Sequence, residues 1–306
     1  MNKEKKIVII LSAYNGGKYI KAQLDTIFRQ KDVDVTCYVR NDGSTDNMLE
    51  VLNSFTSNIK NGSLVINDAN NVGWEKSFLF ALRDAPQGDY YAFADQDDIW
   101  FEDKLISGIE MLEKKNNKDI PLMYHCNKIS TDESLKPLHH QVRRTPKPLN
   151  RQNAMIQEYA QGCSIILNEA ARQLVLRHIP KEKIAHDFWC GLLCYMFGDV
   201  IYDNRPHFYH ISHGNNASGE GHTVGSWKGR LRKFFSDSSV YYLPISDLIE
   251  GYNDMLTEDD KSFLNILSIY KHSFRVKLQL LFSTHFIRDS IMGTLSLKMA
   301  ILLNKL

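Results

Sequence analysis

Three carboxylates stand within four residues, at Asp95, Asp97 and Asp98, directly after the apolar run 90–93. We expect that run to be a buried strand, which places the acids at its carboxyl end, where open α/β sheets bind ligands. Carboxylates this close repel one another unless a cation or several donors neutralise them. A divalent ion that also holds substrate phosphates is the commonest solution. The alternative is an acidic turn in which Asp97 or Asp98 caps the helix that follows.

Two further strand ends carry residues suited to a nucleotide. The segment 12–15, Ser-Ala-Tyr-Asn, precedes a Gly-Gly pair, so that a flat ring could approach the backbone. It does not match GxGxxG, so a dinucleotide fold is not indicated. Asp42 could accept hydrogen bonds from a base or a ribose, while Ser44 or Thr45 after it could cap the next helix.

Asp187 and its neighbours could provide a general base. An acid at the start of a helix is usually a cap, but here the titratable His186 and the aromatic Trp189 flank it. Further along, His210 and His213 lie in a segment that runs into Gly and Asn. A lone histidine is more often structural, but in an open loop these two could contact a metal or a phosphate.

Strands and helices alternate through the first hundred residues. The patterns predict strands over 7–11, 33–39, 64–66 and 90–93, and helices over 19–28 and 74–82. This alternation implies a doubly wound parallel sheet. Beyond it we expect strands over 163–167, 200–202 and 208–211, helices over 169–177 and 187–196, and a mainly helical pattern from 227 onward. The proline-rich stretch 137–148 is expected to be a mobile excursion from the core.

The composition bounds the class of protein. The chain has 306 residues, of which 43% are hydrophobic, enough for one large α/β domain with an appendage or for two domains. Its formal charge of +1 gives no basic field for nucleic acid. The five cysteines match no zinc spacing, as expected for reduced, buried thiols in a cytosolic protein. Because no apolar run is long enough for a signal sequence or a membrane span, we expect a soluble or peripheral protein.

Six short segments occur together at 7–15, 41–46, 95–100, 161–168, 186–189 and 213–216. In this order they resemble bacterial family 2 glycosyltransferases of the GT-A fold, in the rhamnosyltransferase-like branch. The resemblance covers roughly residues 5 to 220. It implies an α/β fold, a Rossmann-like and mostly parallel sheet flanked by helices. It also implies a catalytic domain over 1–226, with a nucleotide-sugar half at about 1–100 and an acceptor half at about 101–226, followed by a helical C-terminal region over 227–306.

The resemblance implies roles for individual residues. The nucleotide-sugar would contact Ala13, Tyr14, Asn15, Asp42 and Asp95. A Mn²⁺ or Mg²⁺ ion would be held by Asp97, Asp98 and His213. The acceptor side would comprise Gly162, Cys163, His186 and Trp189, and Asp187 matches the catalytic base. The sequence departs from the family in two places. His210 occupies a position where the family often has Arg, so a phosphate contact is either lost or made by His210. The stretch 137–148 has no family counterpart.

The implied reaction is inverting, metal-dependent transfer of a sugar from a UDP- or dTDP-sugar to a hydroxyl of a saccharide or lipid-linked saccharide, in capsule, O-antigen or exopolysaccharide synthesis. The alternatives are a sugar-phosphate nucleotidyltransferase, for which 15–18 is a poor triphosphate loop, and a degenerate assembly subunit, against which the retained acids argue. The segment 271–306 has six Lys or Arg and one acid. This segment could pack on the catalytic domain or on a second subunit. Alternatively, it could bind the inner face of the cell membrane as a peripheral anchor. In both cases we expect a cytoplasmic protein.

Overall fold

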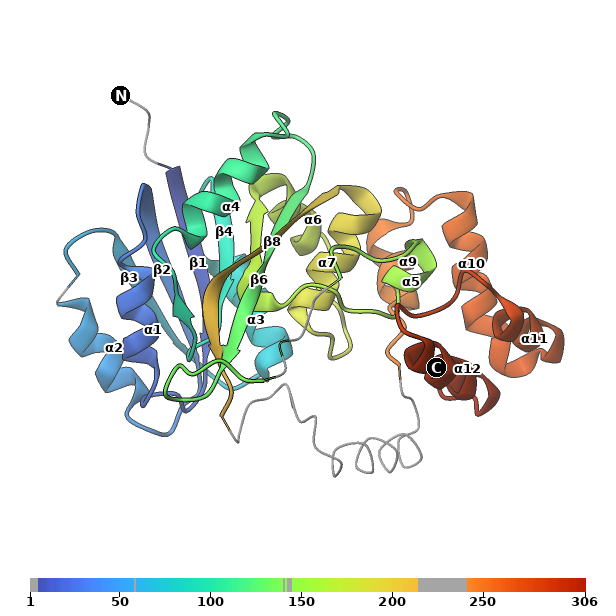
Figure 1. Cartoon of the computed structure of the whole chain (residues 1–306). Coiled ribbons are helices and arrows are strands. Elements are labelled where there is room, and N and C mark those ends of the chain that lie inside the picture. Colours follow the sequence, from blue (N-terminus) through green and yellow to red (C-terminus); the bar gives the residue numbers. More distant parts are fainter. Residues whose placement is uncertain (1–4, 58, 140, 142–144, 214–240) are drawn as a thin grey trace. The chain divides into compact units, whose positions relative to one another are not determined.

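A computed structural model describes residues 5–57, 59–139, 141, 145–213 and 241–306 (Figure 1). The chain divides into two compact units: unit 1 is Met1–Lys147 with Glu158–Ser212, and unit 2 is Pro148–Gln157 with His213–Leu306. The predicted domain boundary at 226/227 and the helical pattern expected at its start lie outside the described residues. The structure also assigns Pro148–Gln157 to the second unit, which the predicted division does not include.

The first half of unit 1 alternates strands and helices as predicted. In order these are β1 (Lys5–Ala13), α1 (Ile20–Ile27), β2 (Val33–Asp42), α2 (Met48–Thr56), β3 (Ser63–Ala69), α3 (Trp74–Asp84) and β4 (Tyr90–Ala94). β3, β2, β1 and β4 are neighbours and run parallel. Ile7, Ile9 and Leu11 of β1 share a core with α1 and α2, while α3 also contacts β1. The strand is therefore covered on both faces, which explains its unbroken apolar run.

The second half of unit 1 adds a mixed sheet. Its elements are β5 (Ile99–Trp100), α4 (Lys104–Glu113), β6 (Leu122–Thr131), the short 3₁₀ helix η1 (Gly162–Ser164), β7 (Ile165–Asn168), α6 (Glu169–Leu176), α7 (His186–Phe197) and β8 (Asp199–Ile211). The sheet order is β3-β2-β1-β4-β7-β6-β8-β5. β7 is antiparallel to β4 and β6, and β5 is antiparallel to β8, so the doubly wound pattern holds only for the first four strands. The Rossmann-like, mostly parallel sheet flanked by helices is confirmed (Figure 1).

Both proposed caps at the strand ends are wrong. The strand β5 lies between Asp98 and α4, and α4 begins at Lys104 with Asp103 at its N-cap, so neither Asp97 nor Asp98 caps it. The helix α2 has Asn47 at its N-cap, so Ser44 or Thr45 does not have that role. Capping therefore does not explain the three carboxylates.

The strand β8 is continuous where two separate strands were predicted. It runs through the residues between the predicted strands 200–202 and 208–211, with register shifts against β6. Asp203 is buried and accepts hydrogen bonds from Arg205, at 2.7–3.1 Å, and from His207, at 3.1 Å. Burial alone would raise the pKa of Asp203, but these partners outweigh it and lower the pKa to about 2.

This network predicts an acid-sensitive contribution to stability. An aspartate in the unfolded chain has a pKa of about 3.9. The Asp203 carboxylate therefore stabilises the fold above about pH 4, and this stabilisation is lost as the pH falls towards about 2. We expect Asp203→Asn to lower the free energy of unfolding at pH 7 by about 1–3 kcal/mol and to flatten its change between about pH 4 and 2. Urea unfolding across that range tests this. Asp199→Asn, which removes an exposed ion pair with Lys115, should change stability by less than about 1 kcal/mol.

Unit 2 is helical over its described residues. Its elements are α5 (Arg151–Ala154), α9 (Ile245–Tyr252), α10 (Glu258–Ile269), the 3₁₀ helix η2 (Tyr270–His272), α11 (Phe274–Phe282) and α12 (Ile291–Leu302). Arg151 forms a bidentate ion pair with Asp260, which also completes a capping box with Thr257 at the start of α10. Within the described ranges, none of the helices has the length and apolar content that crossing a bilayer requires.

Two smaller predictions can be compared with the described residues. All five cysteines are buried and form no disulfide, as expected. The stretch 137–148 contacts β6 at several of its described residues: Gln141 exchanges hydrogen bonds with the backbone of Ser130, the Leu138 amide donates to the Ser130 carbonyl at 2.9 Å, and the Pro146 carbonyl bonds His125 Nε2 at 2.9 Å. At these points the stretch lies along β6, and its mobility stays a prediction.

Candidate active site

The carboxyl ends of the parallel strands meet at one edge of the sheet in unit 1. The residues after β1 and after β4 are joined there: the Tyr14 amide donates to Gln96 Oε1 at 3.0 Å, and Gln96 Nε2 donates to the Tyr14 carbonyl at 3.3 Å. The loop after β2 is joined to them, because the Asn15 amide donates to Ser44 Oγ at 3.0 Å and Asn15 Oδ1 accepts from the Thr45 amide at 2.8 Å. The three predicted nucleotide-binding segments therefore form one surface.

Within this surface, Tyr14 and Asp42 have different environments. The Tyr14 side chain is 50% exposed, whereas Ala13 and Asp42 are buried. The Asp42 carboxylate accepts from the amides of Val72 and Gly73 at 3.1–3.3 Å and pairs with Arg40 at 3.2 Å. Asp42 thus anchors the loop between β3 and α3, and its contact with a base or a ribose stays a prediction.

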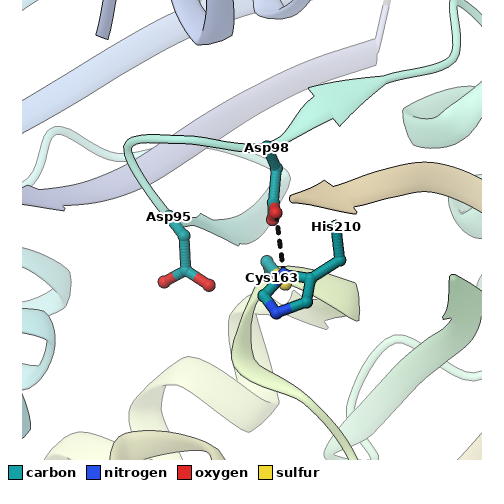
Figure 2. Close-up of side chains that lie close together, drawn as sticks. All are labelled: Asp95, Asp98, Cys163 and His210. Carbon is teal, nitrogen blue, oxygen red and sulfur yellow. Dashed lines mark hydrogen bonds and ion pairs between the residues drawn. The ribbon is translucent and has the colours of Figure 1, made fainter. Parts of the chain in front are cut away.

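A cluster of four side chains lies beside this surface: Asp95, Asp98, Cys163 and His210 (Figure 2). One ligand atom from each lies within 4.8 Å of those from the other three. We call these four residues the acidic cluster. His210 Nδ1 and Asp98 Oδ1 are 2.9 Å apart, and all members except the partly exposed Asp95 are buried.

Two antiparallel strand pairs bring the acidic cluster together. Ile99 of β5 is opposite Tyr209 of β8, and continuing this register by one residue sets Asp98 opposite His210. Ala92 of β4 is opposite Ile166 of β7, so Asp95, directly after β4, and Cys163, in the 3₁₀ helix directly before β7, lie at the same end of this strand pair. The sheet therefore positions the short segments that carry the cluster.

The electrostatics of the acidic cluster show an excess of negative charge. Burial, followed by the charges of Asp98 and Asp97, raises the pKa of Asp95 to about 7. Burial would lower the pKa of His210, but the hydrogen bond and charge of Asp98 outweigh it and leave the pKa above its ordinary value. Burial and the two aspartates also raise the pKa of the Cys163 thiol well above its usual range, which keeps the thiol neutral. A bound cation would relieve this repulsion.

The donor atoms of the acidic cluster suit a divalent cation. Asp98 Oδ2 and His210 Nε2 are buried and have no hydrogen-bond partner among the described residues. A neutral His210 that donates from Nδ1 to Asp98 keeps a lone pair on Nε2, which is the usual arrangement of a metal-binding histidine. Carboxylate oxygens bind Mg²⁺ and Mn²⁺ alike, whereas an imidazole nitrogen favours the transition metal. The residues present therefore fit a divalent cation.

The acidic cluster differs in part from the predicted ligand set. Asp98 was predicted and is a member of the acidic cluster, whereas Asp97 is partly exposed and is not among its four residues. His213, the last described residue before 214, belongs to unit 2. Its neighbours 214–216, the rest of the predicted motif, lie outside the described residues. Ligation by Asp97 and His213 therefore stays a prediction. His210, which the sequence suggested for a metal or a phosphate, is a member of the cluster, and Cys163 is a member that the sequence placed on the acceptor side.

Asp187 lies next to the acidic cluster in unit 1. It is in the first turn of α7, whose N-cap is Ala185, so the alternative that Asp187 is the cap is wrong. Its Oδ2 accepts a hydrogen bond from the Gly162 amide at 3.3 Å. Because the next residue is Cys163, the candidate base and the candidate cation site share the short segment 162–163.

The four predicted acceptor-side residues all lie beneath the surface. His186 is buried and stacks on Phe78, with ring centroids 3.9 Å apart, and burial lowers its pKa to about 3, so it is neutral. Trp189 is fully buried and donates from Nε1 to the His178 carbonyl at 3.3 Å. Gly162 and Cys163 are also buried. Of these four residues, Gly162 holds Asp187 through its amide and Cys163 belongs to the acidic cluster. Direct contacts of all four with an acceptor stay a prediction.

Gly162 is a position where any side chain would disturb Asp187. A Cβ there would lie 2.3 Å from His186 Nε2, and the stacked ring has no space to retreat. We expect Gly162→Ala to lower stability by about 1–3 kcal/mol and to lower turnover, because the amide that holds Asp187 moves. Thermal melting and initial rates test this. Gly191→Ala, whose Cβ would be 3.0 Å from Tyr159, is the matched control in α7 and should cost less.

Similarity to known proteins identifies the family of this chain. The family model described as Glycosyl transferase family 2 matches residues 8–175. A curated relative, the dTDP-rhamnosyl transferase RfbG of Shigella flexneri, is 35% identical over 109 residues, which are 35% of this chain and 38% of that protein. The match to this relative thus spans well under half of its length.

Two solved structures share the fold. TarS of S. aureus in complex with UDP-GlcNAc has a TM-score of 0.55 at 15% identity and covers 92% of this chain and 76% of its own. The mannosyltransferase PcManGT of Pyrobaculum calidifontis, in complex with GDP-Man and Mn²⁺, has a TM-score of 0.52 at 14% identity, with coverages of 99% and 86%. Because the family model matches more than half of the sequence, this chain belongs to glycosyl transferase family 2 and is a glycosyltransferase.

Proposed function

We propose that this glycosyltransferase moves a sugar from a UDP- or dTDP-sugar to a hydroxyl of a saccharide acceptor, with inversion and with a divalent cation. The carrying observation is the geometry around Gly162 and Cys163. The Asp187 carboxylate bonds the Gly162 amide, while Cys163 belongs to the acidic cluster. A proton-accepting group and a cation-binding group thus flank one short segment, as a sugar-transfer site requires.

The relatives' substrates support a nucleotide-sugar as the donor. TarS was solved with UDP-GlcNAc, PcManGT with GDP-Man, and RfbG is described as a dTDP-rhamnosyl transferase. In this chain, we assign the base and ribose to the surface formed by Ala13, Tyr14, Asn15 and Asp42. The exposed Tyr14 ring is suited to stack on a base. The diphosphate would then extend towards Asp95.

The cation would be held by Asp95, Asp98 and His210, with Asp97 and His213 as further ligands that the family resemblance implies. When bound, Mn²⁺ or Mg²⁺ neutralises the charge that develops on the diphosphate leaving group. The chain's own contribution is orientation. Asp98 holds the His210 ring through Nδ1, and the paired strands β5 and β8 fix both residues.

Inversion follows from a single base and a single displacement. Asp187 would accept the proton of the acceptor hydroxyl as its oxygen forms the new bond to the anomeric carbon. The bond from that carbon to the diphosphate oxygen breaks, and its electron pair stays on the phosphate. The Gly162 amide keeps the carboxylate in place.

The acceptor would be a saccharide or a lipid-linked saccharide of a capsule, O-antigen or exopolysaccharide. The rhamnosyltransferase relative and the family resemblance support this pathway class. A site that uses nucleotide-sugars would work in the cytoplasm, where these donors are made, at the inner face of the membrane for a lipid-linked acceptor.

A panel of nucleotide-sugars, scored by thermal shift with and without Mn²⁺, tests the proposal. A donor at about 100 times its Kd should stabilise the protein by about 2.7 kcal/mol, and we expect this only for UDP- or dTDP-sugars with Mn²⁺ present. A shift with a nucleoside triphosphate and turnover of a sugar phosphate would identify a nucleotidyltransferase instead. If no donor binds and none is hydrolysed, the chain is a non-catalytic assembly subunit.

A further inference from the structure

Helices α11 and α12 of unit 2 expose large apolar side chains along their length. In α11 these are Phe274, Leu278 and Phe282, four residues apart. In α12 and directly after it they are Ile291, Met292, Leu295, Met299, Leu302 and Leu303. Phe274, Phe282, Ile291 and Met292 are each 75% exposed or more. Apolar residues at this spacing normally face a core. We call these two rows of exposed residues the apolar stripes, and we expect them to contact a partner outside the described residues.

The two helices form a preformed hairpin and not a loose tail (Figure 1). Lys298 Nζ, on α12, donates to three carbonyl oxygens at the end of α11 and in the following turn, at 2.7–3.0 Å. Asn153 Nδ2 donates to the Ile287 carbonyl at 2.7 Å, and the buried Phe286 ring packs 5.2 Å from Phe263. Contacts within unit 2 therefore fix the turn between α11 and α12, while the apolar stripes stay exposed.

Lys298 is the only charged residue of α12, and its amino group is directed to the carbonyl oxygens near the end of α11. One side of α12 is buried through Leu297, Ala300 and Ile301. The exposed side is mainly apolar, with Ser296 as a small, partly exposed polar residue within it. Such a side is stabilised by contact with an apolar medium.

The charge around the hairpin identifies what covers it. Residues 271–306 hold six of the chain's 37 Lys and Arg but only one of its 36 Asp and Glu, so they carry five formal positive charges and the remainder carries four negative ones. Arg275 and Lys271 are exposed beside the α11 stripe. A second copy meeting this face symmetrically would bring the positive charges together, which disfavours a dimer. An anionic, apolar surface is complementary to both properties.

We propose that the α11–α12 hairpin binds the surface of an anionic phospholipid bilayer. The apolar stripes would enter the boundary between head groups and acyl chains, and the Lys and Arg side chains would lie among the phosphates. The helices have 9 and 12 residues, so they would lie in the plane of the interface. The inference goes beyond the proposed glycosyl transfer and does not depend on it.

Flotation of the full chain with vesicles tests the proposal. We expect binding at least about tenfold tighter to phosphatidylcholine vesicles with about 30% phosphatidylglycerol than to phosphatidylcholine alone, and weaker binding at high salt. The triple variant Phe274→Ser, Phe282→Ser and Ile291→Ser should lose at least about tenfold in affinity. Ile249→Ser, which changes a 46% exposed residue of α9, is the matched control and should bind like the parent.

Two further arms separate the alternatives. Arg275→Gln should weaken binding to the anionic vesicles only. A Phe282→Trp variant should show blue-shifted emission on anionic vesicles, which keeps the test decisive if the triple variant fails to fold. Absence of any anionic preference in the parent would overturn the proposal, as would a triple variant that changes a dimer to a monomer in sedimentation without affecting flotation. Donor binding without vesicles reports separately on the proposed function.

Discussion

An Asp187→Asn variant is expected to bind the nucleotide-sugar donor as tightly as the parent and to lose transfer almost completely. Asparagine preserves the size of the side chain and an oxygen that can accept from the Gly162 amide, now at 3.3 Å. It cannot accept the proton of the acceptor hydroxyl. A positioned general base contributes about 10²–10⁴-fold, so the turnover number should fall by that factor. Calorimetry of the donor and initial transfer rates separate the two effects.

Asp25→Asn is the control for this substitution, because Asp25 forms an exposed ion pair with Lys21 on α1 and should leave both quantities unchanged. A variant at Asp187 that turns over at the parental rate would remove the base assignment. Loss of donor affinity in the same variant, with no change in turnover at saturation, would indicate that Asp187 contacts the donor and not the acceptor.

The first four strands could be predicted because their signal is local. Ile7 to Leu11 and Tyr90 to Ala94 are apolar runs buried on both faces, and no distant contact is needed to recognise them. β6 has no such signal. His125 and Lys128 interrupt its apolar residues, although both side chains are buried in the structure. The pattern therefore predicts strands only where burial and apolarity coincide.

The acidic cluster shows a similar limit. Asp95 and Asp98 stand in one short motif, so their proximity is evident from the sequence. Cys163 and His210 join them only through the antiparallel registers of β7 and β8. The alternation of the first half predicts parallel strands, and it contains no information on these two pairings. The sequence did suggest His210 for a metal or a phosphate, but it did not indicate that His210 would pair with Asp98.

Replacing Asp98 with asparagine is expected to lower Mn²⁺-dependent donor affinity by at least about 10–100-fold. Asp98 is fully buried, its Oδ1 holds the His210 ring at 2.9 Å, and its Oδ2 has no hydrogen-bond partner among the described residues. The substitution removes a negative charge from the cation site and also loosens the histidine that shares it. Donor titrations with and without Mn²⁺ measure the loss.

Asp97→Asn is the matched comparison, because it removes the same charge one position earlier in the chain. The family resemblance implies that Asp97 binds the ion, whereas the structure gathers Asp98 with Asp95 and His210. If these three hold the ion, Asp98→Asn causes the larger loss and His210→Gln reproduces part of it. A larger loss in Asp97→Asn would instead assign the ion to the partly exposed carboxylate. Equal donor affinity of the parent with and without Mn²⁺ would remove the cation from donor binding, because the repulsion within the acidic cluster would then be relieved by the protein alone.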